Sequence, residues 1–369
     1  MKQTKVACFG LGLDQKQLIK KLSKKYIVIG FDTNNEAPGI KYVTKHYSTP
    51  FIQREKIMNI LKKERIQKIY SFATEAPQLL IGYLNSSLSL KGIKYHQISK
   101  VSNKLKFRII LKKNKISQPK FFTYDQNKKK KRLKKKIIAK PIIGSASENI
   151  FILNNIKNLD KNYKNFIFEE YYKTNYVYAI DGFYIKKKFF KVSISKKIKS
   201  KDNVFVDKKI MFNIDNKKIK QKSSDITEKI CSFIKAPNTP VHHEFIFKNN
   251  KIIPIDFHLR GPGSGIYTYL MDKLVFSKIF EIQTNIQNIN SIPLANFFSF
   301  IYFANNINEI KLLKKKIKLF KGVGKKYVKF NNNIKQKQNS TRDRIGVVYF
   351  EFNKYQTFTN FSKKFNKIL

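Results

Sequence analysis

Cysteine is rare in this chain, which has Cys8 and Cys231 and no others among 369 residues. Two cysteines so far apart form neither a metal-binding spacing nor a disulfide framework, and they fit a reducing compartment. Long apolar runs are missing too, because no window approaches the ~18 continuous apolar residues of a membrane-spanning helix. The first apolar run contains Gly10, Gly12 and Asp14 and lacks the cleavage site of a secretory signal. We therefore expect a cytoplasmic protein with no transmembrane segment.

Arginine is also scarce, with seven residues among the 76 basic ones, although the net charge is +52. Such a charge suggests nucleic acid or an anionic surface as a partner. Recognition of phosphates and bases usually relies on arginine forks, however, and here most basic residues are lysines spread along the chain. We expect no specific nucleic-acid partner. The block 128–136 holds eight basic residues in nine, which predicts an exposed helix or loop, with a docking patch for an anionic partner as the alternative.

The first hundred residues alternate between strand and helix patterns. The predicted elements are strands at 5–9, 26–31 and 68–72 and helices at 15–24 and 53–64. This order predicts a parallel sheet with helices on both faces. Gly10 and Gly12 follow the first strand as in a Rossmann-like opening, but they supply only two of the three glycines of a dinucleotide fingerprint. A tight turn or a substrate loop is therefore favoured over a nicotinamide or flavin site.

A loop of small residues follows a predicted strand in the middle of the chain. Residues 137–141 form the strand, 144–147 the loop with sequence Gly-Ser-Ala-Ser, and 149–153 a second strand. The backbone N–H groups and serine hydroxyls of such a loop can point at phosphate oxygens. The alternative is a plain hairpin turn, which needs two such residues. Four in a row favour a loop that covers phosphates.

The run 242–265 predicts a β-hairpin. Polar and apolar residues alternate over 244–247, residues 248–251 form a turn, and 252–257 make a second apolar run. Polar side chains on the two strands can therefore face one pocket. The alternative is an ordinary hairpin whose polar side chains face solvent, followed by a glycine-rich loop.

Three polar side chains of this hairpin predict a cation site. Glu244, Asp256 and His258 project from neighbouring strands, and hard divalent ions that bridge phosphates take about two such carboxylates. Arg260 lies two residues beyond His258, on the same face if the strand continues. Its planar guanidinium is a donor for a phosphate or a carboxylate.

In this order, the segments resemble the ATP-grasp superfamily, in particular the branch of carboxylate-amine ligases and biotin carboxylase, and the resemblance covers nearly the whole chain. The motifs that carry it are 10–15, 30–32 and 72–75, Lys104 with Arg108, Lys140 and Pro141 with 144–147, 169–172, 181–183, the hairpin residues Glu244, Asp256, His258 and Arg260, and 341–350.

The resemblance implies a role for each matching residue. It implies that Lys104 and Lys140 hold ATP phosphates while Ser145 and Ser147 close over them. The residues implied at the hinge that pairs with adenine are Glu169, Glu170, Tyr171 and Tyr172. Those implied as ligands of Mg²⁺ or Mn²⁺ are Glu244, Asp256 and His258, with Arg260 as the catalytic residue that stabilises the acyl phosphate.

Two positions depart from the family's pattern. Asp256 and His258 stand where the family usually has Glu and Asn, and an imidazole suits softer divalent ions better than Mg²⁺. Val177 stands where the family often places a carboxylate for the ribose hydroxyls. Weaker nucleotide binding and a non-catalytic descendant are therefore alternatives to an active enzyme.

The predicted fold class is α/β, with a Rossmann-like N-terminal domain followed by an ATP-grasp fold of two α+β subdomains. The predicted domains are 1–100, the grasp at 101–290 with its lid at about 120–175, and a C-terminal subdomain at 291–369. The expected reaction is ATP-dependent ligation of a small-molecule carboxylate to an amine through an acyl phosphate. A biotin-type carboxylase and a nucleotide-binding pseudoenzyme are the alternatives. A homodimer is left open.

Overall fold

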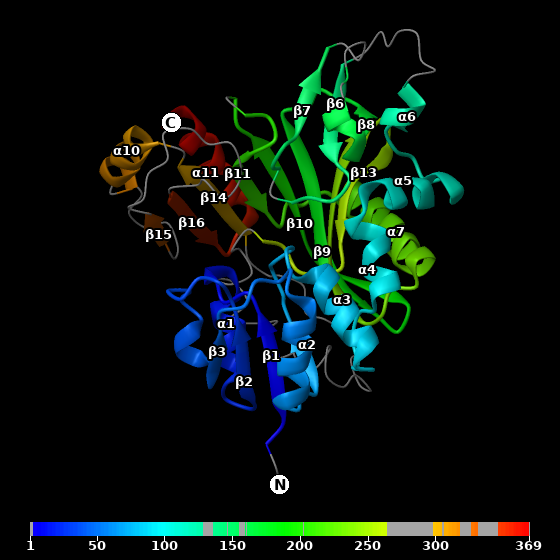
Figure 1. Ribbon diagram of the computed structural model, residues 1–369. Helices are drawn as coiled ribbons and strands as arrows, with labels where there is room; N and C mark the ends of the chain where they lie inside the picture. The colour runs from blue at the N-terminus through cyan, green and yellow to red at the C-terminus, as the bar shows by residue number, and fades with distance from the viewer. Residues whose placement is uncertain are drawn as a thin grey trace.

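The structure is a computed structural model, and it describes residues 3–127, 136–145, 147–154, 159, 161–201, 203–263, 298–304, 306–317, 326–330 and 346–368. Within these ranges the chain forms three sheets (Figure 1). Most of the basic block 128–136, the end of the predicted hairpin run at 264–265, and residues 341–345 of the last family motif lie outside them.

The N-terminal sheet is parallel, with strand order β3-β2-β1-β4. Its strands are β1 (Lys5–Phe9), β2 (Ile27–Phe31), β3 (Lys45–Tyr47) and β4 (Lys68–Tyr70). The helices of this part are α1 (Lys16–Leu22), α2 (Arg54–Lys63), α3 (Gln78–Ser87) and α4 (Tyr95–Ser102), with short 3-10 turns at Leu13–Gln15 and Ile40–Tyr42. The parallel sheet expected from the alternating pattern is confirmed.

The glycine turn after β1 is closed by a side chain. Gln15 donates to the carbonyl oxygens of Phe9 and Gly10, at 2.8 and 2.5 Å, and the Leu11 amide donates to Asp32 at 2.6 Å. A Cβ at Gly10 would lie 2.6 Å from the Gln15 amide nitrogen, and φ at Gly10 is +80°. Because protein groups occupy this turn, the geometry favours the tight turn over a dinucleotide site.

The second sheet has four antiparallel strands in the order β5-β8-β6-β7, and we call it the lid sheet. Its strands are β5 (Phe121–Thr123), β6 (Ile137–Pro141), β7 (Phe151–Leu153) and β8 (Phe166–Glu170). The neighbouring helices are α5 (Lys104–Lys113), α6 (Tyr124–Asn127) and the 3-10 turn Lys161–Asn165. Asn103 caps α5 by accepting from the Lys106 amide at 2.9 Å, as its residue type predicts.

The large sheet has eight antiparallel strands in the order β13-β12-β9-β10-β11-β14-β16-β15. Its strands are β9 (Tyr176–Ile185), β10 (Lys188–Lys199), β11 (Asp207–Phe212), β12 (Thr239–Lys248), β13 (Lys251–His258), β14 (Phe298–Ala304), β15 (Lys326–Phe330) and β16 (Gly346–Phe352). The remaining helices are α7 (Lys217–Ile234), α10 (Ile307–Ile317) and α11 (Tyr355–Ile368).

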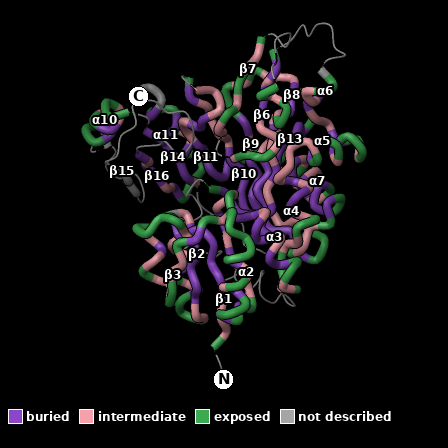
Figure 2. Tube along the Cα trace, viewed as in Figure 1, coloured by how far each residue is buried: buried purple, intermediate pink, exposed green. Residues whose placement is uncertain are grey.

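The central strands of the large sheet are buried on one face by helices (Figure 2). One apolar cluster joins Ile230 of α7 and Phe107 of α5 to Phe257 of β13. Strand β9 runs unbroken through Asp181 and Gly182, and the irregularity lies opposite them, in β10. The antiparallel sheets of the grasp region confirm the predicted fold class, while the domain boundaries stay a prediction. No helix in the described parts of the chain is long and apolar enough to span a membrane.

Candidate functional site

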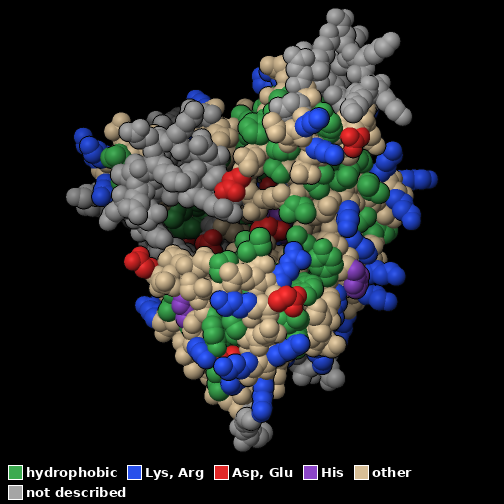
Figure 3. Space-filling view, in the orientation of Figure 1, with side chains coloured by type: hydrophobic (Ala, Val, Ile, Leu, Met, Phe, Trp, Pro, Cys, Tyr) green, Lys and Arg blue, Asp and Glu red, His purple; other side chains and the backbone are tan. Residues whose placement is uncertain are grey.

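Two cavities adjoin each other between the N-terminal part, the lid sheet and the large sheet. Figure 3 shows the molecule hollowed at this point, with acidic side chains visible inside. The first cavity has a volume of about 170 Å³, and its charged and polar lining comprises Ser145, Ser147, Asp181, Ser195, Lys197, Lys199, Asp207, His242, Glu244, Asp256, His258 and Arg260. The second, of about 140 Å³, is lined by Lys104, Lys140, the segment 169–172 and several apolar side chains. Every predicted site residue therefore lines one cavity or both.

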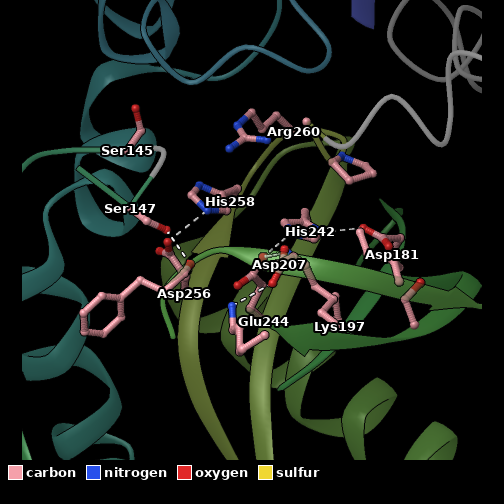
Figure 4. A pocket seen from close by; sticks show the side chains of 17 residues that line it. Ser145, Ser147, Asp181, Lys197, Asp207, His242, Glu244, Asp256, His258 and Arg260 are labelled. Carbon is pink, nitrogen blue, oxygen red and sulfur yellow. Dashed lines mark hydrogen bonds and ion pairs between the residues drawn. The ribbon is translucent and has the colours of Figure 1, made fainter. Parts of the chain in front are cut away.

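Two carboxylates stand side by side where the cavities meet. Glu244 of β12 lies directly opposite Asp256 of β13 in the antiparallel register, and both residues line both cavities (Figure 4). The predicted hairpin is thereby confirmed, with its turn at 248–251. Carboxylates from adjacent strands on one face can share one cation.

Two cationic side chains contact Glu244 and stabilise its carboxylate in the charged form. Lys197 of β10 and the Nε2 atom of His242, at 3.1 Å, both contact Glu244 Oε1. On the other side of the ring, His242 Nδ1 lies 2.6 Å from Asp181. Burial raises the pKa of Glu244, but Lys197 and His242 outweigh it and bring the pKa well below its usual value. Burial lowers the pKa of His242, whereas Asp181 and Glu244 raise it, with a net rise.

His258 bridges the hairpin to the N-terminal part of the chain. Its Nε2 atom lies 3.2 Å from Asp256, and its Nδ1 atom lies 2.9 Å from Glu75, in the segment after β4. Burial opposes the charge of the imidazole, but Asp256 and Glu75 raise its pKa to about 9. An imidazole whose two nitrogens both face carboxylates is placed as an ion-pair donor. The predicted role of His258 as a metal ligand stays a prediction.

Arg260 shares the same carboxylate of Glu75. Its Nε atom donates to Glu75 Oε2 at 2.5 Å, and its Nη1 atom donates to the Gly261 carbonyl at 2.7 Å. Burial raises the pKa of Glu75, yet His258 and Arg260 together lower it far below its usual range. The guanidinium thus faces the first cavity from a position fixed by the N-terminal part of the chain (Figure 4).

The second cavity has cations at one end. Lys140 Nζ lies 2.9 Å from Glu169, and Lys104 Nζ donates to the Gly144 carbonyl at 2.8 Å. Lys104 therefore contacts the small-residue loop that it was expected to work with. Ser145 and Ser147 line the first cavity, and the Ser147 hydroxyl donates to the Phe205 carbonyl at 3.0 Å.

The side chain of Glu169, in the predicted hinge, is held by two cationic residues. Both oxygens of its buried carboxylate are bonded, Oε1 to Arg108 Nε at 2.8 Å and Oε2 to Arg108 Nη2 and Lys140 at 3.0 and 2.9 Å. Burial raises its pKa, but Arg108 and Lys140 lower it to about 2. A carboxylate held in this way joins Arg108 to Lys140 at the wall of the second cavity, and the hinge role of Glu169 stays a prediction. In the hinge backbone, the Glu170 amide donates to the Lys120 carbonyl at 2.8 Å and the Tyr171 amide to the Lys136 carbonyl at 3.0 Å.

One side of the second cavity is apolar. Behind the hinge residues Glu170, Tyr171 and Tyr172, its lining includes Ile138, Ile150, Val177, Ile246 and Ile255. An apolar slot of this kind is suited to a flat heterocyclic base. Val177, where a carboxylate for ribose was expected from the resemblance, is buried in this slot.

A divalent ion fits the pair Glu244 and Asp256. Among the described residues there is no group of three or more His, Cys, Asp or Glu side chains arranged around one point. Mg²⁺ seldom uses such a cage in proteins, because it is usually held by one or two carboxylates together with waters and substrate phosphates. The two opposed carboxylates at the junction of the cavities match that mode of binding.

Several residues at the site were missed at the sequence level. Glu75, Asp181, Lys197, Asp207 and His242 all contact the predicted residues or line the first cavity. Asp181 and His242 stood in segments that were singled out for other reasons. The signal that could have found them is their polarity inside otherwise apolar strands.

Comparison with known proteins matches part of this chain to a known domain. A family model described as the ATP-grasp domain matches residues 101–256. A search of the curated proteins found no match.

Solved structures share the fold over nearly the whole chain. An L-amino acid ligase from Bacillus licheniformis is 15% identical, with a TM-score of 0.78, and covers 100% of this chain and 98% of its own. The N5-carboxyaminoimidazole synthetase of Staphylococcus aureus, complexed with ADP, is 14% identical, with a TM-score of 0.75 and coverage of 99% and 97%.

A third similar structure is the biotin carboxylase domain of the 2-oxoglutarate carboxylase of Hydrogenobacter thermophilus, in complex with MgADP, ADP and bicarbonate. It is 12% identical, with a TM-score of 0.74, and covers 99% of this chain and 89% of its own. Residues 101–256 therefore match the ATP-grasp domain, and nearly the whole chain shares the fold of these solved structures.

Proposed function

We propose that the chain is an ATP-dependent ligase that joins a small-molecule carboxylate to an amine and releases ADP and phosphate. One observation carries the proposal: the two cavities meet at Glu244 and Asp256. The second cavity has an apolar slot and lysines for a nucleotide, and the first has charged groups of both signs for a small polar substrate. The γ-phosphate of a nucleotide in the second cavity would therefore face a substrate in the first.

The chain's own residues supply the binding of ATP. Lys104 and Lys140 lie where they can hold the phosphates, and Ser145 and Ser147 stand at the edge of the first cavity, where the loop can cover the reacting groups. Lys140 donates to Glu169 in the free protein, and this contact orients its ammonium group before the nucleotide binds. When bound at Glu244 and Asp256, Mg²⁺ or Mn²⁺ neutralises charge on the transferring phosphoryl group.

The reaction needs two displacements and no side-chain nucleophile. A carboxylate oxygen of the substrate attacks the γ-phosphorus of ATP, and the bond to the bridging oxygen breaks to release ADP. The amine nitrogen then attacks the acyl carbon, and the tetrahedral adduct loses phosphate and the amine proton to give the amide. Arg260 faces the first cavity and can stabilise the negative charge of the adduct.

The experiment is an ADP-release screen over pooled carboxylates and amines, with mass detection of the joined product. Bicarbonate is included as a separate arm. ADP release that needs both a carboxylate and an amine supports the ligase. Release that depends on bicarbonate alone would assign a carboxylase, and nucleotide binding without release in any pool would assign a pseudoenzyme. Lys140→Ala is the control, because it removes a phosphate contact while both cavities keep their acidic residues.

A further inference from the structure

The hairpin that carries the two carboxylates contains one extra residue. From the turn upward, Lys248 pairs with Lys251 and Phe245 pairs with Pro254, but Glu244 pairs with Asp256. The register skips Ile255, so β13 has a β-bulge there, one residue before the carboxylate. Pro254 comes directly before the bulge. A proline is compatible with this place because a bulge interrupts the ladder of backbone hydrogen bonds, to which proline cannot donate.

The bulge determines which face of the sheet Asp256 occupies. In a regular strand, side chains alternate between faces, so Ile255 and Asp256 would point to opposite sides. Here both line the second cavity, and Phe257 packs in the helix-covered cluster on the other face. Without the bulge, the register set by the turn would pair Asp256 with His243 and turn its carboxylate toward the helices. Phe257 would then face the cavity.

Arg108 binds the backbone of the bulge. Its Nη1 atom donates to the Pro254 carbonyl at 2.7 Å, and its Nη2 atom donates to the Ile255 carbonyl at 3.1 Å. The residue is 1% exposed, and β13 stands at the end of the strand order, so these carbonyls are covered by α5 instead of a further strand. The Nε and Nη2 atoms also donate to Glu169, whose carboxylate neutralises the guanidinium charge.

We propose that Arg108 is a positioning residue that fixes the β-bulge at Ile255 and thereby keeps Asp256 opposite Glu244 at the junction of the two cavities. This inference rests on the proposed function for the use of the two carboxylates, but the structural claim does not need it. Arg108 lines neither of the two cavities. It acts through its contacts with the backbone of β13. Glu169, which Arg108 shares with Lys140, links the same guanidinium to the lid sheet.

An arginine suits this task better than a lysine. A guanidinium has five donors in a rigid plane and can hold two successive carbonyls and a carboxylate at once, whereas an ammonium is a flexible point charge. Arg108→Lys therefore keeps the positive charge beside Glu169 but should lose at least one of the two bulge contacts. The matched control is Leu111→Ala, one turn later on α5, which removes buried volume from the same helix and has no hydrogen bond to β13.

The first readout is hydrogen–deuterium exchange of the free protein, measured on peptides that cover β12 and β13. We expect Arg108→Lys to raise exchange in residues 253–258 at least tenfold relative to wild type. Leu111→Ala should change exchange in the same residues by less than threefold. Each protein is measured the same number of degrees below its own melting temperature. No nucleotide or metal is present, so this result is independent of the proposed reaction. Equal exchange in wild type and Arg108→Lys would overturn the inference.

The second readout is Mn²⁺ binding with a non-hydrolysable ATP analogue, followed by the paramagnetic signal of free Mn²⁺. Arg108→Lys should weaken Mn²⁺ binding at least tenfold while nucleotide affinity without metal stays within about threefold. A loss of both affinities to the same extent would overturn the positioning role. A wild type that binds no Mn²⁺ with nucleotide would contradict the proposed function instead, and the exchange experiment would still decide the inference.

Deleting Ile255 provides a rescue test. The deletion removes the extra residue, so a regular ladder from the same turn again places Asp256 opposite Glu244. In the deletion background, Arg108→Lys should then raise hydrogen–deuterium exchange in the residues of β13 that follow Pro254 by less than threefold. If Arg108→Lys folds only together with the deletion, that outcome also supports the inference. If neither the single nor the double variant folds, Arg108 serves the fold as a whole and the positioning role is overturned.

Discussion

Glu75 Oε2 lies 2.5 Å from Arg260 Nε, although 185 residues separate them in the chain. The contact joins the segment after β4 of the N-terminal sheet to the end of β13 in the large sheet. The Gly261 amide donates to the Phe72 carbonyl at 2.9 Å in the same region. The N-terminal part of the chain therefore holds the arginine that faces the first cavity.

Arg260→Ala is expected to lower turnover by about 10²–10³-fold, because a charged donor to the acyl phosphate and the tetrahedral adduct is lost. ATP affinity should change little, since the interaction forms mainly as the reaction proceeds. Glu244→Gln is the comparison, and it should weaken metal-dependent ATP binding together with turnover. Carboxylate-dependent ADP release and ATP affinity are measured for both variants. Unchanged turnover in Arg260→Ala would contradict its catalytic role.

Removal of Glu75 should lower turnover through Arg260. Glu75→Gln leaves both cations without their shared carboxylate, so the guanidinium loses its fixed orientation. We expect turnover to fall about tenfold or more, with metal-free ATP affinity unchanged, because Glu75 lines neither cavity described above. A double variant Glu75→Gln/Arg260→Ala should be no slower than Arg260→Ala alone. Additive losses would show that Glu75 acts independently.

ATP with Mg²⁺ or Mn²⁺ should raise the melting temperature, because a ligand that binds the folded state stabilises it by mass action. At 100 times the dissociation constant the gain is about 2.7 kcal/mol. Lys140→Ala should remove most of the shift, since Lys140 lies at the phosphate end of the second cavity. The shift in melting temperature is measured by thermal denaturation of wild type and variant with each metal at millimolar ATP. No shift with either metal in wild type would contradict nucleotide binding.

Some of the site could be predicted from the sequence because it is encoded locally. Alternation over 244–247, a turn and a second apolar run were enough to place Glu244 and Asp256 on neighbouring strands, since a hairpin brings neighbouring segments together. The small-residue loop was likewise visible in four consecutive residues. Local pattern did not, however, show that one extra residue, Ile255, was needed to bring the second carboxylate onto the same face.

Other parts of the site depend on contacts between distant segments. Glu75 follows the short strand β4, in one of the segments that resemble the ATP-grasp superfamily. Nothing in the local sequence shows that Glu75 contacts Arg260. Glu169 reads as part of a hinge, and only the packing of α5 against the lid sheet brings Arg108 to its carboxylate. Such ion pairs are fixed by how sheets pack, which sequence periodicity does not report.

Gly261→Ala should disturb the contact between the N-terminal part and β13. A Cβ at this position would lie 2.1 Å from Cζ of Phe72, whose ring is 2% exposed and has little room to move. We expect a loss of about 1–3 kcal/mol in unfolding free energy, as for other overpacked sites, and lower turnover because Arg260 is adjacent. Phe72→Leu in the same chain should recover part of both. Denaturant unfolding and ADP release measure them, and wild-type values for Gly261→Ala would contradict the close packing.

Glu169 should make stability depend on pH. Its pKa of about 2 in the folded protein lies below the ordinary value of 4.5, so its contribution is present above pH 4.5 and is lost as the pH falls toward 2. Glu169→Gln leaves Arg108 and Lys140 buried without their carboxylate, which should cost about 3–5 kcal/mol at pH 7. The difference in unfolding free energy between wild type and this variant should therefore shrink between pH 4.5 and 2, measured by urea denaturation. Glu55→Gln, at an exposed glutamate, should change stability by about 0.5 kcal/mol or less at any pH. A Glu169→Gln variant as stable as Glu55→Gln at pH 7 would contradict the buried ion-pair cluster.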